Sequence, residues 1–282
     1  MAALQKLSEK RRVFCEVTGR TLELPKRLQR IVSLSPAITE TLYELGLGDK
    51  VVGVSAFDVH PEEARKKPIL GSYSHTNIDK LITLEPELVF LTTGYQRDLA
   101  LRLADTFPVY AAELPLSVSS IVDMVRRIGL VTGELRAGDM LSKRLFQTVC
   151  EIPKVTHGRA YIEIDLGGPV SFGAYSYLTD ALNLLGGSNI FADEPCEWLT
   201  PDFQFVRAAA PEIILYEPKM FRREKLIEVS KKFVTRGWAD LESVRGNRIF
   251  VSPGPADMMA HHGPSFITKT MPWMAECLRS LV

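Results

Sequence analysis

The sequence predicts an α/β protein in which two lobes, each with a parallel central sheet, are joined by one long rigid helix. Short apolar runs that suit buried strands alternate with helical segments, which is typical of a parallel α/β sheet. The same order of segments begins again near residue 160. Between the two series, one helical pattern continues for about 30 residues.

The first series begins with a hairpin and continues as alternating strands and helices. Residues 13–24 alternate around Thr18-Gly19-Arg20, which is typical of a short hairpin. A loop rich in proline, glycine, serine and tyrosine covers residues 57–75, and Asn77 is expected to cap the helix that follows. Strands are expected at 30–35, 51–54, 88–91 and 107–110, and helices at 36–45 and 78–84.

The second series repeats this alternation after residue 153. A strand is expected at 160–164, and a glycine-rich turn follows at 167–173. Gly186-Gly187 ends a helix that begins at Tyr177. Two further strands are expected at 213–216 and 248–251, with helices at 203–208, 225–234 and 266–281.

Residues 117–150 are predicted to form a single helix, because apolar residues recur at steps of three and four until Pro153. Its length would be roughly 45 Å, enough to connect two lobes. Gly129, Gly133 and Gly138 each weaken it by roughly 1 kcal/mol relative to alanine. The alternative is two ordinary helices broken near Gly138. With a single helix, the expected domains are an N-terminal lobe 1–116, a linking helix 117–152 and a C-terminal lobe 153–282.

Two pairs of segments match between the halves, in the same order. Residues 39–46 correspond to 179–186, and residues 84–89 correspond to 209–214. This pattern indicates an internal duplication with the helix between its copies. Two such lobes would leave a cleft, and ligands of α/β folds bind where strand ends face a crevice.

Composition excludes several classes of protein. The chain has 282 residues, enough for two modest domains, and no formal net charge, so nothing indicates a nucleic-acid partner. The basic run around Arg222 and Arg223 is balanced by two glutamates and is expected to be a solvated helix face. No apolar window reaches the length of about 18 residues that a membrane span needs.

The amino-terminal residues and the cysteines give information about the cellular compartment of the protein. The first dozen residues are charged and lack an apolar core, so no intact signal peptide is expected in this sequence. The chain is then either cytosolic or follows a removed leader. Cys15 has no small residue before it and is a poor lipoprotein acceptor. The cysteines show no metal-ligand spacing, and Cys150 and Cys277 are expected to be buried thiols.

No motif of a known catalytic chemistry appears. A P-loop, a Gly-x-Ser-x-Gly elbow and a His-Glu-x-x-His helix are all absent, so no catalytic residue is assigned and no enzyme is expected. His261-His262 is the most metal-like feature, but zinc would need two further ligands. These histidines fit a polar loop, a ligand contact or a metal site, and we assign no metal.

Aromatic residues give the stronger indication of a ligand. Tyr73 and Trp198 each precede the helix that leads to the Pro-Glu strand of their half. If the duplication holds, both rings project from equivalent positions toward the cleft. A flat ligand between them would gain about 0.5–1.5 kcal/mol per ring beyond area burial. The alternative is that each ring packs on its own lobe. Comparable loops carry Phe57, Tyr95, Phe172, Tyr175 and Tyr177.

These residues are accompanied by short motifs in a fixed order: Thr18-Gly19-Arg20, Arg30-Ile31-Val32-Ser33-Leu34-Ser35-Pro36, Gly71-Ser72-Tyr73, Asn77-Ile78-Asp79, Leu84-Glu85-Pro86-Glu87 and Gly237-Trp238. Together the motifs resemble the substrate-binding proteins of ABC importers that take iron–siderophore complexes, haem or vitamin B12. The resemblance covers residues 17–281. It implies two Rossmann-like lobes, one rigid connecting helix and a largely preformed cleft.

The resemblance also implies roles for particular residues. The expected ligand-binding residues are Tyr73, Trp198, Ser35, Phe57, Tyr95, Phe172, Tyr175 and His262. One acidic residue per lobe would dock on the permease; Asp79 suits that role, whereas Gln204 stands at the corresponding place in the second half. Asp202 is close enough in sequence to substitute for it.

The implied function is capture of a metal chelate and its delivery to an ABC transporter permease by a monomer without an intrinsic cofactor. The chelate would be cobalamin, haem or a ferric siderophore. Around the expected cleft, aromatic residues and histidines outnumber arginines, of which Arg97 and Arg207 are the nearest candidates. This slightly favours a corrinoid or haem-like macrocycle. The implied location is periplasmic or extracytoplasmic. The alternative is a cytosolic protein or enzyme that uses the same fold on a corrinoid or tetrapyrrole.

Overall fold

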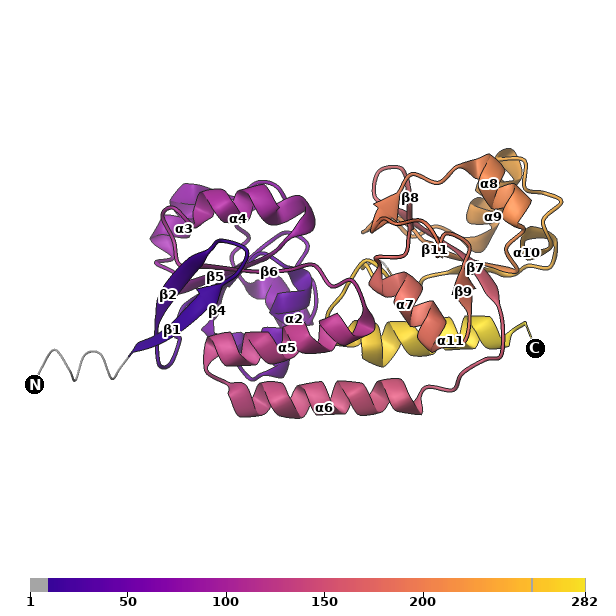
Figure 1. The fold of residues 1–282 in the computed structure, drawn as a ribbon. Coiled ribbons are helices and arrows are strands. Elements are labelled where there is room, and N and C mark those ends of the chain that lie inside the picture. Colours follow the sequence, from indigo (N-terminus) through magenta and orange to yellow (C-terminus); the bar gives the residue numbers. More distant parts are fainter. Residues whose placement is uncertain (1–9, 255, 282) are drawn as a thin grey trace, which may run out of the picture. The chain divides into compact units, whose positions relative to one another are not determined.

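The structure is a computed structural model that describes residues 10–254 and 256–281. Most of the charged amino-terminal segment considered above lies outside the described residues. The chain divides into two compact units. Unit 1 takes the described residues up to Leu114 together with Val122–Arg144, and unit 2 takes Pro115–Ile121 and the residues from Leu145 onward. Each unit has its own sheet and helices, so the α/β class with two lobes is confirmed (Figure 1).

Unit 1 is built on a parallel sheet with strand order β4-β3-β5-β6. Its strands are β3 (Ile31–Ser33), β4 (Val51–Val54), β5 (Leu88–Thr92) and β6 (Val109–Ala112), and nearly all their residues are buried. A continuous apolar strand is typical of a sheet covered on both faces. All four strands agree with the sequence prediction to within a few residues.

Helices cover both faces of this sheet. Helix α2 (Pro36–Glu44) and the part of α5 (Val118–Thr132) that belongs to unit 1 lie on one face, and α3 (Ile78–Thr83) and α4 (Arg97–Leu103) lie on the other (Figure 1). Helix α4 was not predicted. The predicted hairpin is confirmed, since β1 (Lys10–Cys15) pairs antiparallel with β2 (Arg20–Pro25).

The prediction of one unbroken helix over residues 117–150 is wrong. Helix α5 ends at Thr132, and a second helix, α6 (Leu135–Glu151), begins three residues later. Gly133 lies between them with φ of +89°, the left-handed conformation in which helices commonly end at glycine. Arg11, from the hairpin, donates to the last carbonyl groups of α5, at 3.1 Å to Leu130 and 3.0 Å to Val131. The break near Gly138 is also wrong, because that residue lies inside α6.

The two glycines that remain inside these helices allow α5 and α6 to pack closely in opposite directions. A Cβ atom added to Gly129 would lie 2.8 Å from the Cα of Gly138. The Ser142 hydroxyl donates to the Val122 carbonyl at 3.3 Å, and Arg126 pairs with Asp139 at 2.9 Å. The predicted linking segment is therefore a helical hairpin whose residues are divided between the units.

Unit 2 has a sheet of six strands among the described residues, with order β10-β8-β7-β11-β12 and β9 paired to β7. Strands β7 (Arg159–Asp165), β9 (Ser188–Asn189), β11 (Ile213–Glu217) and β12 (Ile249–Val251) are parallel. Strands β8 (Pro169–Phe172) and β10 (Trp198–Leu199) extend the sheet antiparallel. The predicted glycine-rich turn at 167–173 is therefore wrong beyond Gly168, because most of that segment is β8.

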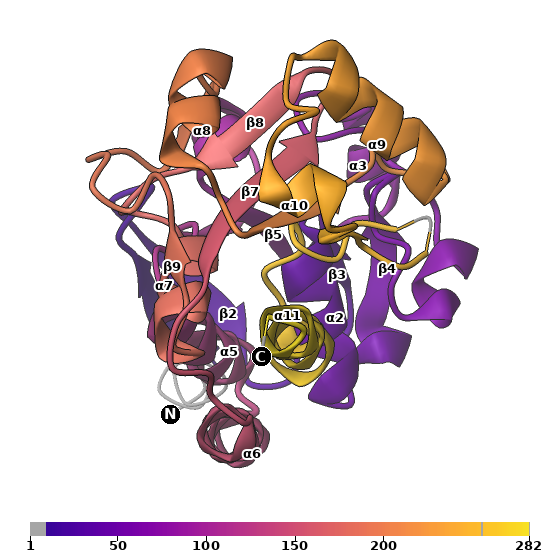
Figure 2. The same ribbon diagram turned by 90° about the vertical axis from the view of Figure 1, so that its right-hand side faces the viewer.

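Two groups of helices cover the sheet of unit 2 (Figures 1 and 2). Helices α7 (Tyr177–Leu184) and α11 (Met271–Arg279) lie on one face, and α8 (Phe203–Ala209), α9 (Leu226–Thr235) and α10 (Glu242–Arg245) lie on the other. The second group encloses a core around Tyr161, Phe233 and Trp238. The predicted closing helix at 266–281 begins as a π-helical turn, Phe266–Thr270, and only then becomes α11.

Equivalent residues of the two halves adopt the same local structure, as the duplication predicts. Glu85 and Ala210 both have positive φ, at 42° and 46°. Two residues later, the backbone N–H of Glu87 donates to the Arg30 carbonyl at 2.9 Å, and that of Glu212 donates to the Arg159 carbonyl at 2.8 Å. Each glutamate carboxylate also accepts from the N–H of the same arginine. These bonds attach the Pro-Glu turn to the amino end of β3 in unit 1 and of β7 in unit 2.

The cysteines are all unpaired thiols. Cys277 is buried as predicted, but Cys150 is exposed on α6, so that part of the prediction is wrong. Within residues 10–254 and 256–281, we find no helix with the length and apolar character that spanning a bilayer requires.

Candidate ligand-binding faces

The carboxyl ends of parallel strands gather three of the predicted ligand residues at one edge of unit 1. Ser35, Phe57 and Tyr95 follow β3, β4 and β5, which lie side by side in the sheet. Since the carboxyl ends of parallel strands meet at the same edge, the chain segments that carry these residues share that edge. Tyr95 is 69% exposed there, whereas Ser35 is buried.

Phe57 and Tyr73 form a stacked pair of rings in unit 1. Their centroids are 4.4 Å apart and the ring planes differ by 22°, an offset-stacking geometry that is favourable by about 0.5–1.5 kcal/mol. Both side chains remain partly exposed. The Tyr73 loop turns at Gly71, where a Cβ atom would lie 1.9 Å from the His75 carbonyl oxygen. Phe57 and Tyr73, both predicted to bind the ligand, therefore form one stacked aromatic pair.

A buried carboxylate that sequence reasoning missed fixes the Phe57 loop. Asp58 is 2% exposed, and it accepts hydrogen bonds from the backbone N–H of Ser55 at 2.9 Å and from the hydroxyl groups of Ser55 and Thr39. Hydrogen bonds to a buried carboxylate are stronger than neutral ones. Asp58 thus ties the β4 loop to helix α2 and holds the neighbouring ring in place.

Gln96 performs a similar task for Tyr95. Its side-chain oxygen accepts from the Thr92 backbone N–H at 3.1 Å, and its amide nitrogen donates to the Leu34 carbonyl at 2.7 Å. Gln96 is buried, so both groups satisfy polar atoms that would otherwise lack water. The turn that presents Tyr95 is therefore attached to two strands. Ser35 differs, because its hydroxyl group has no hydrogen-bond partner within the described residues.

In unit 2, two predicted residues pair directly across strands. Trp198 of β10 lies opposite Phe172 of β8 in the antiparallel ladder. Opposite residues in such a ladder have neighbouring side chains. Trp198 is 38% exposed, whereas Phe172 is buried. A partly exposed indole beside a buried ring offers one face to a ligand.

The loop that carries Tyr175 is fastened beside this pair. The backbone N–H of Tyr175 donates to the Cys196 carbonyl at 3.0 Å, and the backbone N–H of Ala174 donates to the Glu194 carbonyl at 2.7 Å. Gly173 is required for this approach, because a Cβ atom would lie 2.5 Å from the Cys196 carbonyl oxygen. Next to Trp198, burial raises the pKa of Glu197 to about 7.

The loop with the two histidines is held by an acid that the sequence analysis also missed. Glu217, at the end of β11, accepts hydrogen bonds from the backbone N–H groups of Met258, Met259 and Ala260 at 2.8, 2.6 and 2.9 Å. Burial raises the pKa of Glu217 to about 7. An acidic residue that ends a buried apolar strand, Ile213–Glu217, was the sequence signal that could have identified it.

His262 lies at the end of this loop and is not a free surface ligand. Its Nε2 atom is buried without a hydrogen-bond partner, and its ring lies 5.9 Å from that of Tyr177. Burial lowers the pKa of His262 to about 3, so the ring is neutral at pH 7. Within the described residues, no group of three histidine, cysteine, aspartate or glutamate side chains is arranged to hold a metal ion. A ligand contact through His262 stays a prediction.

The two residues expected to dock on a permease occupy equivalent places. Asp79 is the second residue of α3 and Gln204 is the second residue of α8, and both side chains are exposed. Asn77 and Asp202 cap these helices, accepting from backbone N–H groups at 2.9 and 2.8 Å. Because Asp202 caps α8, its carboxylate already has a structural partner.

The arginines that the sequence placed nearest to a ligand also have defined surroundings. Arg97 begins α4 and is exposed, whereas Arg207 of α8 pairs with Asp240 at 2.8 Å. Three further cations, Lys219, Arg222 and Arg223, follow the carboxyl end of β11. All three are exposed.

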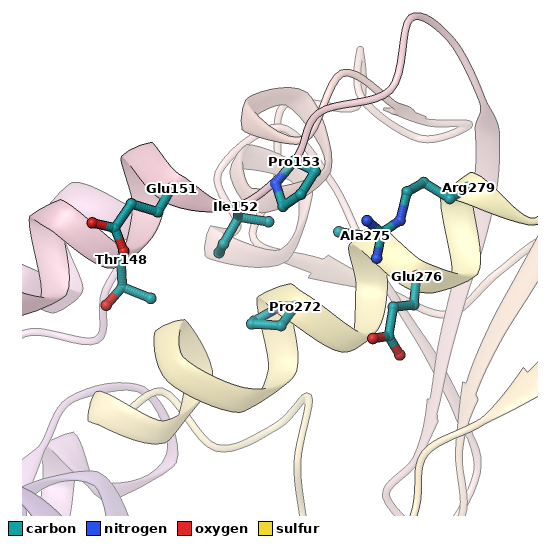
Figure 3. A pocket seen from close by; sticks show the side chains of 8 residues that line it. All are labelled: Thr148, Glu151, Ile152, Pro153, Pro272, Ala275, Glu276 and Arg279. Carbon is teal, nitrogen blue, oxygen red and sulfur yellow. The ribbon is translucent and has the colours of Figure 1, made fainter.

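Figure 3 shows a groove in unit 2 between the last turn of α6 and α11, with a volume of about 290 Å³. It is lined by Thr148, Glu151, Ile152, Pro153, Pro272, Ala275, Glu276 and Arg279. None of the predicted ligand residues lines it. We therefore do not assign the chelate to this groove.

Comparisons with known proteins agree with this architecture. A Bacillus subtilis protein described as an uncharacterized ABC transporter substrate-binding lipoprotein, YvrC, is 26% identical over 265 residues, covering 89% of this chain and 81% of its own. A vitamin B12-binding protein of Yersinia pestis is 26% identical over 201 residues, covering 69% of this chain and 71% of its own. The solved structure of the periplasmic haem-binding protein RhuT from Roseiflexus is 22% identical, with a TM-score of 0.76, covering 89% of this chain and 98% of its own.

The first two relatives are named as binding proteins, not as enzymes. The RhuT structure, below 25% identity, supports the fold alone. A family model described as periplasmic binding protein matches residues 31–256, which is most of the chain. The chain therefore belongs to the periplasmic binding protein family.

Proposed function

We propose that this protein is the substrate-binding component of an ABC importer and that it captures a metal chelate with a flat macrocycle. The observation that carries the proposal is an aromatic face on each unit: the Phe57–Tyr73 stack in unit 1, and Trp198 with its cross-strand partner Phe172 in unit 2. A relative named for vitamin B12 makes a corrinoid the first ligand to test, and haem, for which a protein with the same fold is named, is the second.

The loops that carry these rings are anchored before any ligand arrives. Asp58 and Gln96 fix the unit 1 loops, and backbone bonds to residues 194–196 fix the Tyr175 loop. A preformed face loses less conformational entropy on binding, so more of the interaction energy appears as affinity. The exposed phenol of Tyr95 would add an oxygen donor, and phenolate is a known axial ligand of haem iron.

Delivery to a permease would use the starts of α3 and α8. Asp79 and Gln204 occupy equivalent exposed positions, each in its own unit, so each unit would offer a similar helix start to the permease. Only the first carries a charge. We propose that the unit 1 contact is an ion pair and that the unit 2 contact is a neutral hydrogen bond.

We place the protein outside the cytoplasm, since members of this family are periplasmic and one relative is described as a lipoprotein. Cell fractionation tests the location: the full-length protein is expected in the periplasmic or membrane-associated fraction. Recovery with cytosolic proteins would favour the alternative of a cytosolic corrinoid- or tetrapyrrole-binding protein.

The proposal is tested by titrating the purified protein with cyanocobalamin, haemin and a panel of ferric siderophores, followed by changes in tryptophan fluorescence and ligand absorbance. Trp198→Ala is expected to weaken binding of the preferred ligand by about 5- to 150-fold, because one stacking ring is lost. Phe14→Ala is the control, since it removes another exposed ring, from the β1 hairpin. Equal losses in the two variants, or no ligand bound by the wild type, would contradict the proposal.

A further inference from the structure

Helix α9 and the loop before it carry an exposed surface that the ligand-binding role does not use. We call it the α9 surface, and it consists of Lys219, Phe221, Arg222, Arg223, Lys225, Leu226, Ile227, Lys231 and Val234. All nine side chains are exposed. Figure 2 shows α9 on the outside of unit 2, beside α10.

The α9 surface is positive in a chain that has no net charge. Residues 219–235 include six basic and two acidic side chains, a formal charge of +4. Both acids already have partners: Glu224 pairs with Lys232 at 3.1 Å, and Glu228 accepts from the Lys225 backbone N–H at 2.9 Å. Within the part of the chain that the structure describes, none of the five basic residues of the α9 surface forms an ion pair.

The same surface exposes large apolar side chains between its cations. Helix α9 buries Val229 and Phe233 in the core of unit 2. Its opposite face carries Ile227 and Val234, seven residues apart and therefore on one side of the helix, at 63% and 47% exposure. Lys231 lies between them along that face. The helix is thus apolar on two faces, and within residues 10–254 and 256–281 only the face with Val229 and Phe233 is buried.

Phe221 adds a third apolar group, on the loop before the helix. It is 58% exposed and has φ of +68°, a conformation that costs about 1–3 kcal/mol for a residue with a bulky side chain. Folding gains nothing from an exposed ring in a strained backbone. An external partner that buries the ring would offset that cost.

We propose that the α9 surface docks on an anionic phospholipid surface. Exposed lysine and arginine interleaved with phenylalanine, leucine and isoleucine match what an interfacial helix presents to a membrane: cations at the level of the lipid headgroups and apolar side chains below them. An acidic protein or a nucleic acid as the partner would explain the exposed cations of the α9 surface. Neither partner would explain the four exposed apolar residues that lie among these cations.

The position of the surface suits delivery of a ligand. The loop with Lys219 and Phe221 leaves the carboxyl end of β11, the strand whose last residue, Glu217, anchors the histidine loop. Docking through this loop would bring the carboxyl edge of the unit 2 sheet close to the membrane. A substrate-binding protein held there would search for its permease over a surface instead of through a volume.

Vesicle co-sedimentation of the full chain tests the proposal. At low salt the wild type is expected to bind vesicles of phosphatidylglycerol and phosphatidylcholine and to ignore vesicles of phosphatidylcholine alone. Arg222→Ser with Arg223→Ser is expected to weaken this binding about 10- to 30-fold, since each cation near an anionic bilayer contributes about a factor of five. Raising sodium chloride to about 0.5 M should release most of the protein.

Apolar contact is tested by Phe221→Ser with Ile227→Ser, which leaves every charge in place and is expected to weaken binding to the anionic vesicles at least tenfold. The matched controls are Arg65→Ser with Lys66→Ser, an exposed basic pair beside two glutamates, and Phe14→Ser, an exposed ring in unit 1. Both should bind as the wild type does.

Three results would overturn the proposal: no binding of the wild type to anionic vesicles, equal binding to neutral vesicles, or unchanged binding of both α9 variants. If the wild type ignores vesicles while the α9 variants lose binding to detergent-solubilised permease, the surface serves an acidic protein instead, and lipid docking is wrong.

Discussion

Replacing Glu217 with glutamine is expected to remove a pH-dependent part of the stability of unit 2. The carboxylate is 1% exposed and fixes the histidine loop through three backbone N–H groups. Burial raises its pKa to about 7 from an ordinary value of 4.5, with the nearby carboxylate of Asp257 acting in the same direction. Between these two pH values, the folded protein holds a proton that the unfolded chain releases.

The sign and size of the effect follow from that difference in proton binding. Because the folded state binds more protons, the free energy of unfolding falls as pH rises from about 4.5 to about 7 and is constant above that range. A raised pKa of this size corresponds to about 3 kcal/mol at 1.36 kcal/mol per pH unit. Glutamine cannot ionise, so the variant lacks this decline. It is also less stable at every pH, since its amide nitrogen cannot accept the bonds of Met258 and Met259.

Urea unfolding of the wild type and Glu217→Gln at pH 5, 6 and 7.5 measures the effect. The stability advantage of the wild type over the variant is expected to shrink by about 2–3 kcal/mol between pH 5 and pH 7.5. Burial also raises the pKa of Asp257, to about 6, but Asp257 is present in both proteins and its contribution largely cancels. Met259→Leu is the control, because it changes the same loop without an ionisable group. An advantage that stays constant or grows with pH would refute the reasoning.

Three further changes test other parts of the structure. Gly129→Ala should destabilise the α5–α6 hairpin by about 1–3 kcal/mol in urea unfolding despite the higher helix propensity of alanine, because the new Cβ would lie 2.8 Å from Gly138; equal or higher stability would contradict the close packing. Arg236→Ala should lower the free energy of unfolding by about 3–5 kcal/mol in the same assay. In the wild type, a guanidinium nitrogen of Arg236 lies 2.5 Å from a carboxylate oxygen of the buried Glu163, and the variant leaves this carboxylate without its cation; a loss below about 1 kcal/mol would contradict that pairing. Asp58→Asn should weaken chelate binding with little change in fold, measured by titration and circular dichroism, and unchanged affinity would show that the Phe57 loop needs no such anchor.

The strands of unit 1 and the duplication could be predicted because they depend on local pattern. Buried parallel strands are continuous apolar runs, and the Pro-Glu turns at Glu87 and Glu212 repeat with the same backbone bonds. Sequence similarity between the halves therefore reflected a similarity of structure.

The break between α5 and α6 could not be predicted from periodicity, because the apolar pattern continues through it. The break depends on contacts with distant residues: the Arg11 side chain from the hairpin satisfies the end of α5, and Gly138 meets Gly129 across the turn. Considered within one helix, Gly129 and Gly138 would only weaken it. In the structure, the same two glycines allow α5 and α6 to pack closely against each other.

The small strands of unit 2 escaped prediction for another reason. Strands β9 and β10 have two residues each, too few to show an alternating pattern. Trp198 was identified by its residue type and its place in the duplication, whereas its pairing with Phe172 became evident only from the sheet register. Glu217 and Asp58 were missed because acids are ordinarily exposed, and the buried ones are recognised by their partners.

The central proposal is that the aromatic face of each unit contributes to chelate affinity, and a double-mutant cycle tests it most directly. The dissociation constant of the preferred chelate is measured by absorbance titration for the wild type, Tyr73→Ala, Trp198→Ala and the double variant. Each single variant is expected to weaken binding of the same ligand by about 5- to 150-fold. A loss confined to one of the two variants would show that only one unit holds the ligand, and would contradict the account.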